Sequence, residues 1–129
     1  MYDTRTNLYY TIDHLWVRPG QRTVQVGLTD FASEALGDIL FVTMPTNGSA
    51  VCRFESFAAV ETTKSIVDLL APVNGAVVAC NEAVVQTPHL LNDDPYGHGW
   101  MCEVEIYNLI ELSDLLKPEE YEQLIENTD

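Results

Sequence analysis

Short apolar runs separated by turn-forming residues occupy the first two thirds of the sequence and limit the fold more than any other feature. Residues 22–28, RTVQVGL, alternate apolar and polar side chains as a half-buried strand does, and residues 37–45, GDILFVTMP, end at Pro45 before a TNG turn. Runs this short, punctuated by Gly, Pro and Asn, predict antiparallel strands in a small β-sandwich or flattened barrel. Four further strands are expected in SFAAVE, SIVDLLAP, GAVVACN and GWMCEVEI.

Two helices are expected outside this mainly β architecture. In LTDFASEALG, Thr29 or Asp30 can cap a short helix, and Gly37 stands where a left-handed C-terminal cap is favoured. Near the C-terminus, SDLLKPEEYEQLIEN places Pro118 at a helix start and acidic residues in the first turn. Its apolar residues recur on one face: Tyr121, Leu124 and Ile125. Because no linker or low-complexity segment interrupts the chain, residues 1–129 are expected to form a single domain.

The charge balance restricts the partners of the chain. Twenty acidic residues against six basic ones leave a net charge of −14, which makes contact with nucleic-acid phosphates or anionic lipids unfavourable. The apolar runs are too short to cross a bilayer, and MYDTRTNLYY does not have the pattern of a secretory signal. We therefore expect a cytoplasmic protein that contacts neither nucleic acid nor membrane and meets partners with basic surfaces.

No motif indicates an active site or a metal site. The sequence has no Gly-x-Ser-x-Gly, His-Glu-x-x-His, phosphate-binding glycine loop or dinucleotide fingerprint. Cys52, Cys80 and Cys102 are widely spaced, which favours three small buried residues over a disulfide framework or a zinc site. We expect no metal and no catalysis by this chain itself.

The remaining polar and aromatic residues are expected to have structural roles. The segment TPHLLNDDPYGHG is rich in Pro, Asn, Asp and Gly, which predicts an irregular, exposed loop. Its residues Asp94, Tyr96 and His98 are therefore interpreted as exposed turn residues. Trp16 and Trp100 are expected in the core.

Lys64 is the candidate functional residue. It lies in VETTKSIVDLL, between two apolar runs that predict a hairpin with this lysine at or near its tip. Such a turn would present a flexible primary amine on a rigid base, which suits both modification by an enzyme and use as a swinging arm.

The chain resembles the glycine cleavage H-protein family over its whole length from about Tyr9. ETTKS stands where the family has Glu-Ser-Val-Lys-Ala, and HLWV, at His14 to Val17, is similar to the family's His-Glu-Trp-Val. Other matching segments follow in order: VGLTDFASEALGDILFVTMP, APVNGAVVACNEAV, NDDPYGHGWM and ELSDLLKPEEYEQLI.

The resemblance implies a lipoyl-domain-like sandwich and lipoate bound covalently to Lys64 by an amide, attached by a lipoate ligase or lipoyltransferase. Glu61, three residues before Lys64, matches the family's acidic position and is a candidate for recognition by that enzyme. The family further implies a carrier that is not itself an enzyme and whose arm accepts an aminomethyl group from glycine decarboxylase. An aminomethyltransferase then releases the one-carbon unit, and dihydrolipoyl dehydrogenase reoxidises the arm.

Four departures from the family pattern bear on the pathway. Leu15 replaces an acidic residue that some members use on the surface facing a partner, and Ala35 replaces a histidine that can shelter the loaded arm. Thr62-Thr63 stands where Ser-Val is usual, and the segment AVCRFESFAAVE brings in Cys52 and Arg53. An alternative is therefore an H-like lipoate-binding protein serving heterodisulfide-reductase-like enzymes of bacterial sulfur oxidation. A second is an unlipoylated interaction module.

Overall fold

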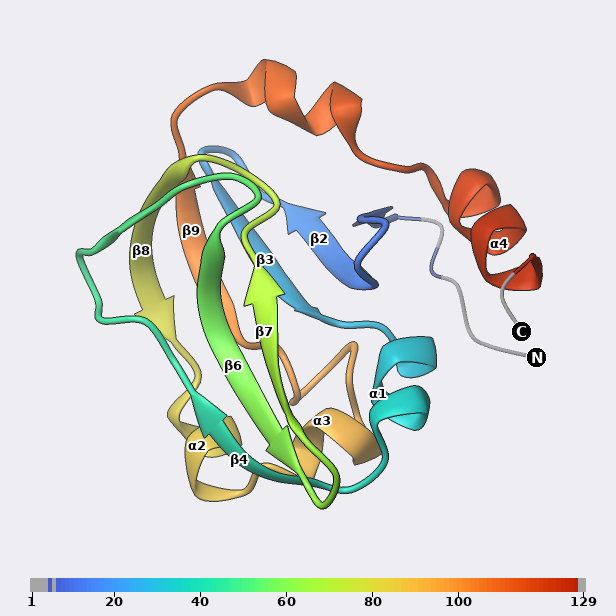
Figure 1. Cartoon of the computed structure of the whole chain (residues 1–129). Helices are drawn as coiled ribbons and strands as arrows, with labels where there is room; N and C mark the ends of the chain where they lie inside the picture. Colours follow the sequence, from blue (N-terminus) through green and yellow to red (C-terminus); the bar gives the residue numbers. More distant parts are fainter. Residues whose placement is uncertain (1–4, 6, 128–129) are drawn as a thin grey trace.

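Two antiparallel sheets form the framework of the protein (Figure 1). The structure is a computed structural model, and it describes residue 5 and residues 7–127. Within these residues, the larger sheet has the strand order β1-β2-β3-β9-β8-β5 and the smaller one the order β4-β6-β7. The strands are β1 (Tyr9–Tyr10), β2 (Leu15–Pro19), β3 (Thr23–Leu28), β4 (Ile39–Thr43), β5 (Ala50–Val51), β6 (Ser56–Thr62), β7 (Ile66–Leu70), β8 (Gly75–Cys80) and β9 (Cys102–Ile106).

The main core lies between the two sheets and follows from the alternation within the strands. In β3, Val24 and Val26 are buried and pair in register with Val104 and Cys102 of β9. In β6, Val60 is fully buried, whereas the next residue, Glu61, is exposed on the other face of the strand. This pattern confirms the predicted sandwich, because side chains at successive strand positions point to opposite faces.

The predicted helix after β3 is confirmed as α1 (Asp30–Leu36). Thr29 is its N-cap, and its hydroxyl accepts a hydrogen bond from the backbone N–H of Ala32 at 3.1 Å. Gly37 ends the helix with φ = 78°, a left-handed conformation that residues with a side chain adopt rarely. The cap residues thus explain both ends of α1.

The C-terminal helix is also confirmed, as α4 (Pro118–Glu126), preceded by the 3₁₀ helix η1 (Leu109–Asp114). It packs at the β1–β2 edge of the larger sheet through a second apolar cluster (Figure 1). There Tyr121 stacks on Tyr10 with ring centroids 4.5 Å apart. Trp16, fully buried as expected, donates its indole N–H to the carbonyl of Pro95 at 2.9 Å, whereas Trp100 is half-buried.

The segment 87–99 differs from the predicted exposed loop. It follows the short helix α2 (Glu82–Gln86) and contains α3 (Leu90–Asp93), and both Leu91 and Tyr96 are buried. The hydroxyl of Tyr96 donates a hydrogen bond to the Asp30 carboxylate at 3.1 Å, and burial raises the pKa of Tyr96. The prediction holds for His98, which is exposed in a turn. It was wrong for Leu91 and Tyr96, because Pro, Asn, Asp and Gly indicate turns but do not reveal whether a turn is covered by another element.

The cysteines meet the expectation only in part. Cys102 is buried and Cys80 half-buried, in directly paired positions of β8 and β9, with sulfur atoms 3.9 Å apart. Cys52, in contrast, is exposed, so its interpretation as a buried residue was wrong. It follows the two-residue strand β5, whose single buried side chain is Val51. All three cysteines are free thiols.

Candidate functional site

Lys64 lies in the tight turn that joins β6 to β7, at the tip of the hairpin (Figure 1). The strands pair in regular register up to the turn, with Val60 opposite Val67 and Glu61 opposite Ile66. The backbone N–H of Thr62 then donates to the carbonyl of Ser65 at 2.9 Å. Thr63 and Lys64 are therefore the central residues of the turn.

The hydroxyl of Thr62 organises this turn. Its Oγ1 atom accepts hydrogen bonds from the backbone N–H groups of Lys64 at 3.1 Å and Ser65 at 3.2 Å. Two-residue hairpin turns usually adopt mirror-image conformations with positive φ. In the described residues, neither Thr63 nor Lys64 has positive φ. The Thr62 side chain instead accepts the hydrogen bonds of the two backbone N–H groups in the turn. The Thr62-Thr63 departure thus retains a hydroxyl at the position of the family's serine.

The Lys64 ammonium is exposed and available for modification. In the part of the chain that the structure describes, no hydrogen bond or ion pair engages it. Glu61, the candidate recognition residue, lies three residues before the lysine on the outer face of β6 and is also exposed. The structure therefore brings both predicted site residues onto one hairpin.

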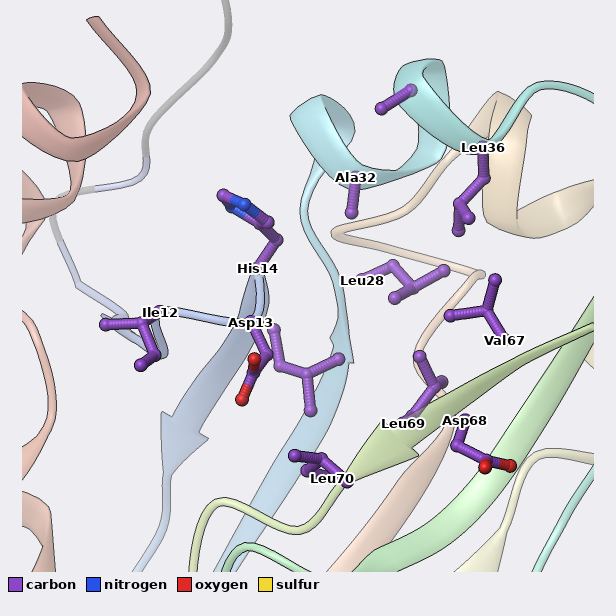
Figure 2. A pocket seen from close by; sticks show the side chains of 12 residues that line it. Ile12, Asp13, His14, Leu28, Ala32, Leu36, Val67, Asp68, Leu69 and Leu70 are labelled. Carbon is purple, nitrogen blue, oxygen red and sulfur yellow. The ribbon is translucent and has the colours of Figure 1, made fainter. Parts of the chain in front are cut away.

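A cavity of about 450 Å³ opens beside the same hairpin, between β7, the segment preceding β2, and α1 (Figure 2). Most of its lining is aliphatic, and Val67 and Leu69 of β7 contribute to it. Asp13 lies between His14 and Leu70 in this view, whereas the carboxylate of Asp68 points away from the other labelled side chains. The cavity therefore combines apolar walls with a carboxylate at its rim.

His14 connects this cavity to the C-terminal helix. Its Nδ1 atom lies 2.9 Å from the hydroxyl of Tyr121, which lies 2.7 Å from the hydroxyl of Thr29 at the start of α1. Its ring packs against Phe31 at 4.7 Å between centroids. Burial lowers the pKa of His14, with a smaller opposing effect from Asp13, so the imidazole is neutral at pH 7. Sequence inspection missed this network because its members lie far apart in the chain.

The position of Leu15 corrects an expectation. Leu15 is fully buried, at the start of β2 and in the cavity wall, rather than on a surface that faces a partner. Its side chain belongs to the main core, together with Leu28 of the neighbouring strand β3. Ala35 is exposed and lines the same cavity. Both departures therefore lie in the lining of the cavity.

The other singled-out residues do not join this site. Asp94, Tyr96 and His98 do not line the cavity, and Tyr96 is buried rather than exposed as expected. The departure at Arg53 has a structural explanation, because its guanidinium forms an ion pair of 3.1 Å with Asp114. That pair borders a smaller hollow of about 190 Å³ beside the main cavity.

Two further properties concern metals and membranes. Among residues 5 and 7–127, no group of three or more His, Cys, Asp or Glu side chains is arranged to hold a metal ion. None of the helices in that same region has the length and apolar character required to cross a membrane.

Comparison with known proteins identifies the family. The sequence profile of the glycine cleavage H-protein family matches residues 8–128. The chain is 47% identical over 120 residues to the glycine cleavage system H protein of Carboxydothermus hydrogenoformans, covering 93% of this chain and 92% of that protein. It is 42% identical over 125 residues to a probable glycine cleavage system H protein of Haloarcula marismortui, covering 97% and 98%.

A solved structure agrees with the sequence comparison. The crystal structure of a glycine cleavage system H protein from Mycobacterium marinum superposes with a TM-score of 0.86 at 38% sequence identity, covering 95% of this chain and 98% of that one. This agreement confirms the expected lipoyl-domain-like sandwich with its short helix and C-terminal helix. From the sequence profile, the relatives and the superposed structure together, we conclude that the chain belongs to the glycine cleavage H-protein family.

Proposed function

We propose that this chain is a single-domain lipoyl carrier of glycine cleavage, with lipoate attached to Lys64 by an amide bond. The observation that supports this most directly is the exposed Lys64 amine, at the tip of a hairpin whose turn is held by the Thr62 hydroxyl. When bound, lipoate supplies a disulfide that opens to accept a one-carbon amine unit and is later re-formed. The chain itself contributes attachment, shelter and presentation.

The residues of the cavity fit such a group. Lipoate is an acyl chain ending in a dithiolane, and it therefore suits walls made of aliphatic side chains such as Leu28 and Val67. Val67 lies three residues after Lys64, which corresponds to about 10 Å along an extended strand. An extended lysine side chain carrying an eight-carbon acyl group spans more than this distance, so the cavity lies within reach of the arm.

The charge at the cavity rim bears on the cargo. Asp13 places a carboxylate beside the cavity, and the whole chain has a net charge of −14. Both features favour a cationic amine over an anionic oxidised-sulfur group, because like charges repel most strongly where water is partly excluded. This argument favours glycine cleavage over the sulfur-oxidation alternative, and the buried position of Leu15 removes one reason for proposing a retargeted docking surface.

The partners follow from the carrier role. We propose that a lipoate ligase or lipoyltransferase modifies Lys64 and recognises the exposed carboxylate of Glu61. Glycine decarboxylase, aminomethyltransferase and dihydrolipoyl dehydrogenase then act on the loaded carrier. Because the sequence contains none of the catalytic motifs sought above, we expect the chain to have no turnover of its own.

The decisive experiment combines mass analysis with reconstitution. Protein incubated with lipoate, ATP and a lipoate ligase should gain one lipoyl group by intact mass. Lys64→Arg should abolish this addition, whereas Lys117→Arg, at the start of the distant helix α4, should not. The loaded protein should then support release of carbon dioxide and NADH with the three glycine cleavage enzymes. An addition that survives Lys64→Arg would refute the attachment site, and a fully loaded protein that those enzymes ignore would refute the pathway.

A further inference from the structure

One row of side chains crosses the outer face of the smaller sheet next to the Lys64 turn. Phe41 of β4 is paired in register with Glu61 of β6, which is paired in turn with Ile66 of β7. The two apolar members are 64% and 69% exposed, respectively. Directly opposed side chains on one face of a sheet lie about 5 Å apart at Cβ, so these three form one continuous strip.

The exposure of Phe41 and Ile66 is not required by the fold. The main core lies on the opposite face of the smaller sheet, where Val60 and Leu69 are buried. Large apolar side chains on a solvated strand face cost solubility and mark contact sites when they gather together. Here Ile66 lies two residues after the lysine that we propose to be modified, and Phe41 pairs with Glu61, three residues before it.

The charge on this face is uniformly negative. Glu61 lies at the centre of the strip, and Asp68 lies diagonally from it, since Asp68 pairs with Ala59 on the same face. Strands β4, β6 and β7 contain no lysine or arginine. Within the described residues, no hydrogen bond or ion pair engages the Glu61 carboxylate. A complementary surface therefore needs a cation between two apolar recesses.

The size of the strip decides between classes of partner. Two exposed apolar side chains are far fewer than a stable interface of about 800 Å² per partner requires, so the strip does not suit a permanent dimer. It suits a brief encounter with an enzyme that must cover the hairpin to receive its lysine. When such an enzyme binds the hairpin, it covers the residues of the strip first, because they lie next to the turn.

We propose that Phe41 and Ile66, on either side of Glu61, form the docking strip for the enzyme that attaches lipoate to Lys64. This inference rests on the proposed function of Lys64. It adds apolar contacts of Phe41 and Ile66 to the recognition of Glu61 by the same enzyme. The strip is expected to contact an enzyme surface in which an Arg or Lys side chain lies between two apolar recesses. Its main contribution is to affinity for the unmodified carrier.

The experiment measures lipoylation kinetics of the intact protein with its own lipoate ligase, lipoate and ATP. Phe41→Thr and Ile66→Thr place a β-branched residue, which favours strand structure, at each position while removing the apolar surface. They should lower kcat/KM by about tenfold and fivefold, mainly through a higher KM. The matched control is Ile110→Thr, because Ile110 is 72% exposed in η1, at the end of the molecule away from the hairpin (Figure 1). Its kcat/KM should be unchanged.

The outcomes separate this inference from the proposed function. If wild type is lipoylated at Lys64 and the Phe41 and Ile66 variants are modified as fast as Ile110→Thr, the docking strip is refuted and the carrier role stands. If wild type gains no lipoyl group at Lys64, the carrier role itself fails. If both variants are lipoylated normally but, once loaded, no longer exchange carbon dioxide with glycine decarboxylase, the strip serves that enzyme and our assignment is overturned.

Discussion

Replacing Thr62 by valine should loosen the turn that presents Lys64. Valine has nearly the same shape as threonine but has no hydroxyl, so the N–H groups of Lys64 and Ser65 lose their shared acceptor. Each such hydrogen bond contributes about 0.5–1.5 kcal/mol net. Because Lys64 and Ser65 are both exposed, water replaces part of the loss, and we expect a total cost of about 1–2 kcal/mol.

Thermal unfolding and lipoylation rates measure this effect. For a chain of this size, about 1 kcal/mol corresponds to roughly 4 °C in Tm, so Thr62→Val should lower Tm by about 4–8 °C. Lipoylation of Lys64 should slow by up to about tenfold, because the ligase meets a turn that is ordered less of the time. Thr62→Ser, which keeps the hydroxyl, should restore most of both properties.

A neighbouring residue provides the matched control. Thr63 is exposed, and no hydrogen bond of its hydroxyl is found among the described residues. Thr63→Val therefore makes the same chemical change one position away without removing an acceptor. If Thr62→Val and Thr63→Val have the same Tm and the same lipoylation rate, the Thr62 hydroxyl does not organise the turn.

Three further predictions follow from the cavity. Leu15→Glu should destabilise the fold by about 2–4 kcal/mol at pH 7 in chemical denaturation, because it buries a carboxyl where Leu15 is fully covered; a neutral effect would show that the cavity admits water there. Since burial lowers the pKa of His14, the unfolded chain binds its proton first as pH falls. The contribution of His14 to stability should therefore decrease from about pH 6.5 down to its lowered pKa, and this decrease should appear as the difference between wild type and His14→Gln, because the raised pKa of His89 acts with the opposite sign in both proteins. Asp13→Asn should leave lipoylation unchanged and slow reconstituted glycine cleavage several-fold; equal rates would show that its carboxylate does not assist a cationic cargo.

Local patterns in the sequence were sufficient for the elements that surround the site. The alternation in Thr23–Leu28 and Ser56–Thr62 predicts which side chains face the core, because strand geometry ties each position to one face. Thr29, Gly37 and Pro118 mark helix ends, since caps depend on one or two residues only. The Lys64 hairpin follows from the same kind of local information.

The tertiary structure alone decided how distant segments meet. The cavity joins β7, α1 and the segment before β2, and its wall includes Leu15, whose burial no local pattern indicated. His14, Thr29 and Tyr121 form one network although 107 positions separate the first from the last. The strip of Phe41, Glu61 and Ile66 likewise depends on the register of three strands. Periodicity specifies the face on which a side chain lies, whereas its neighbours across the sheet depend on packing of the whole chain.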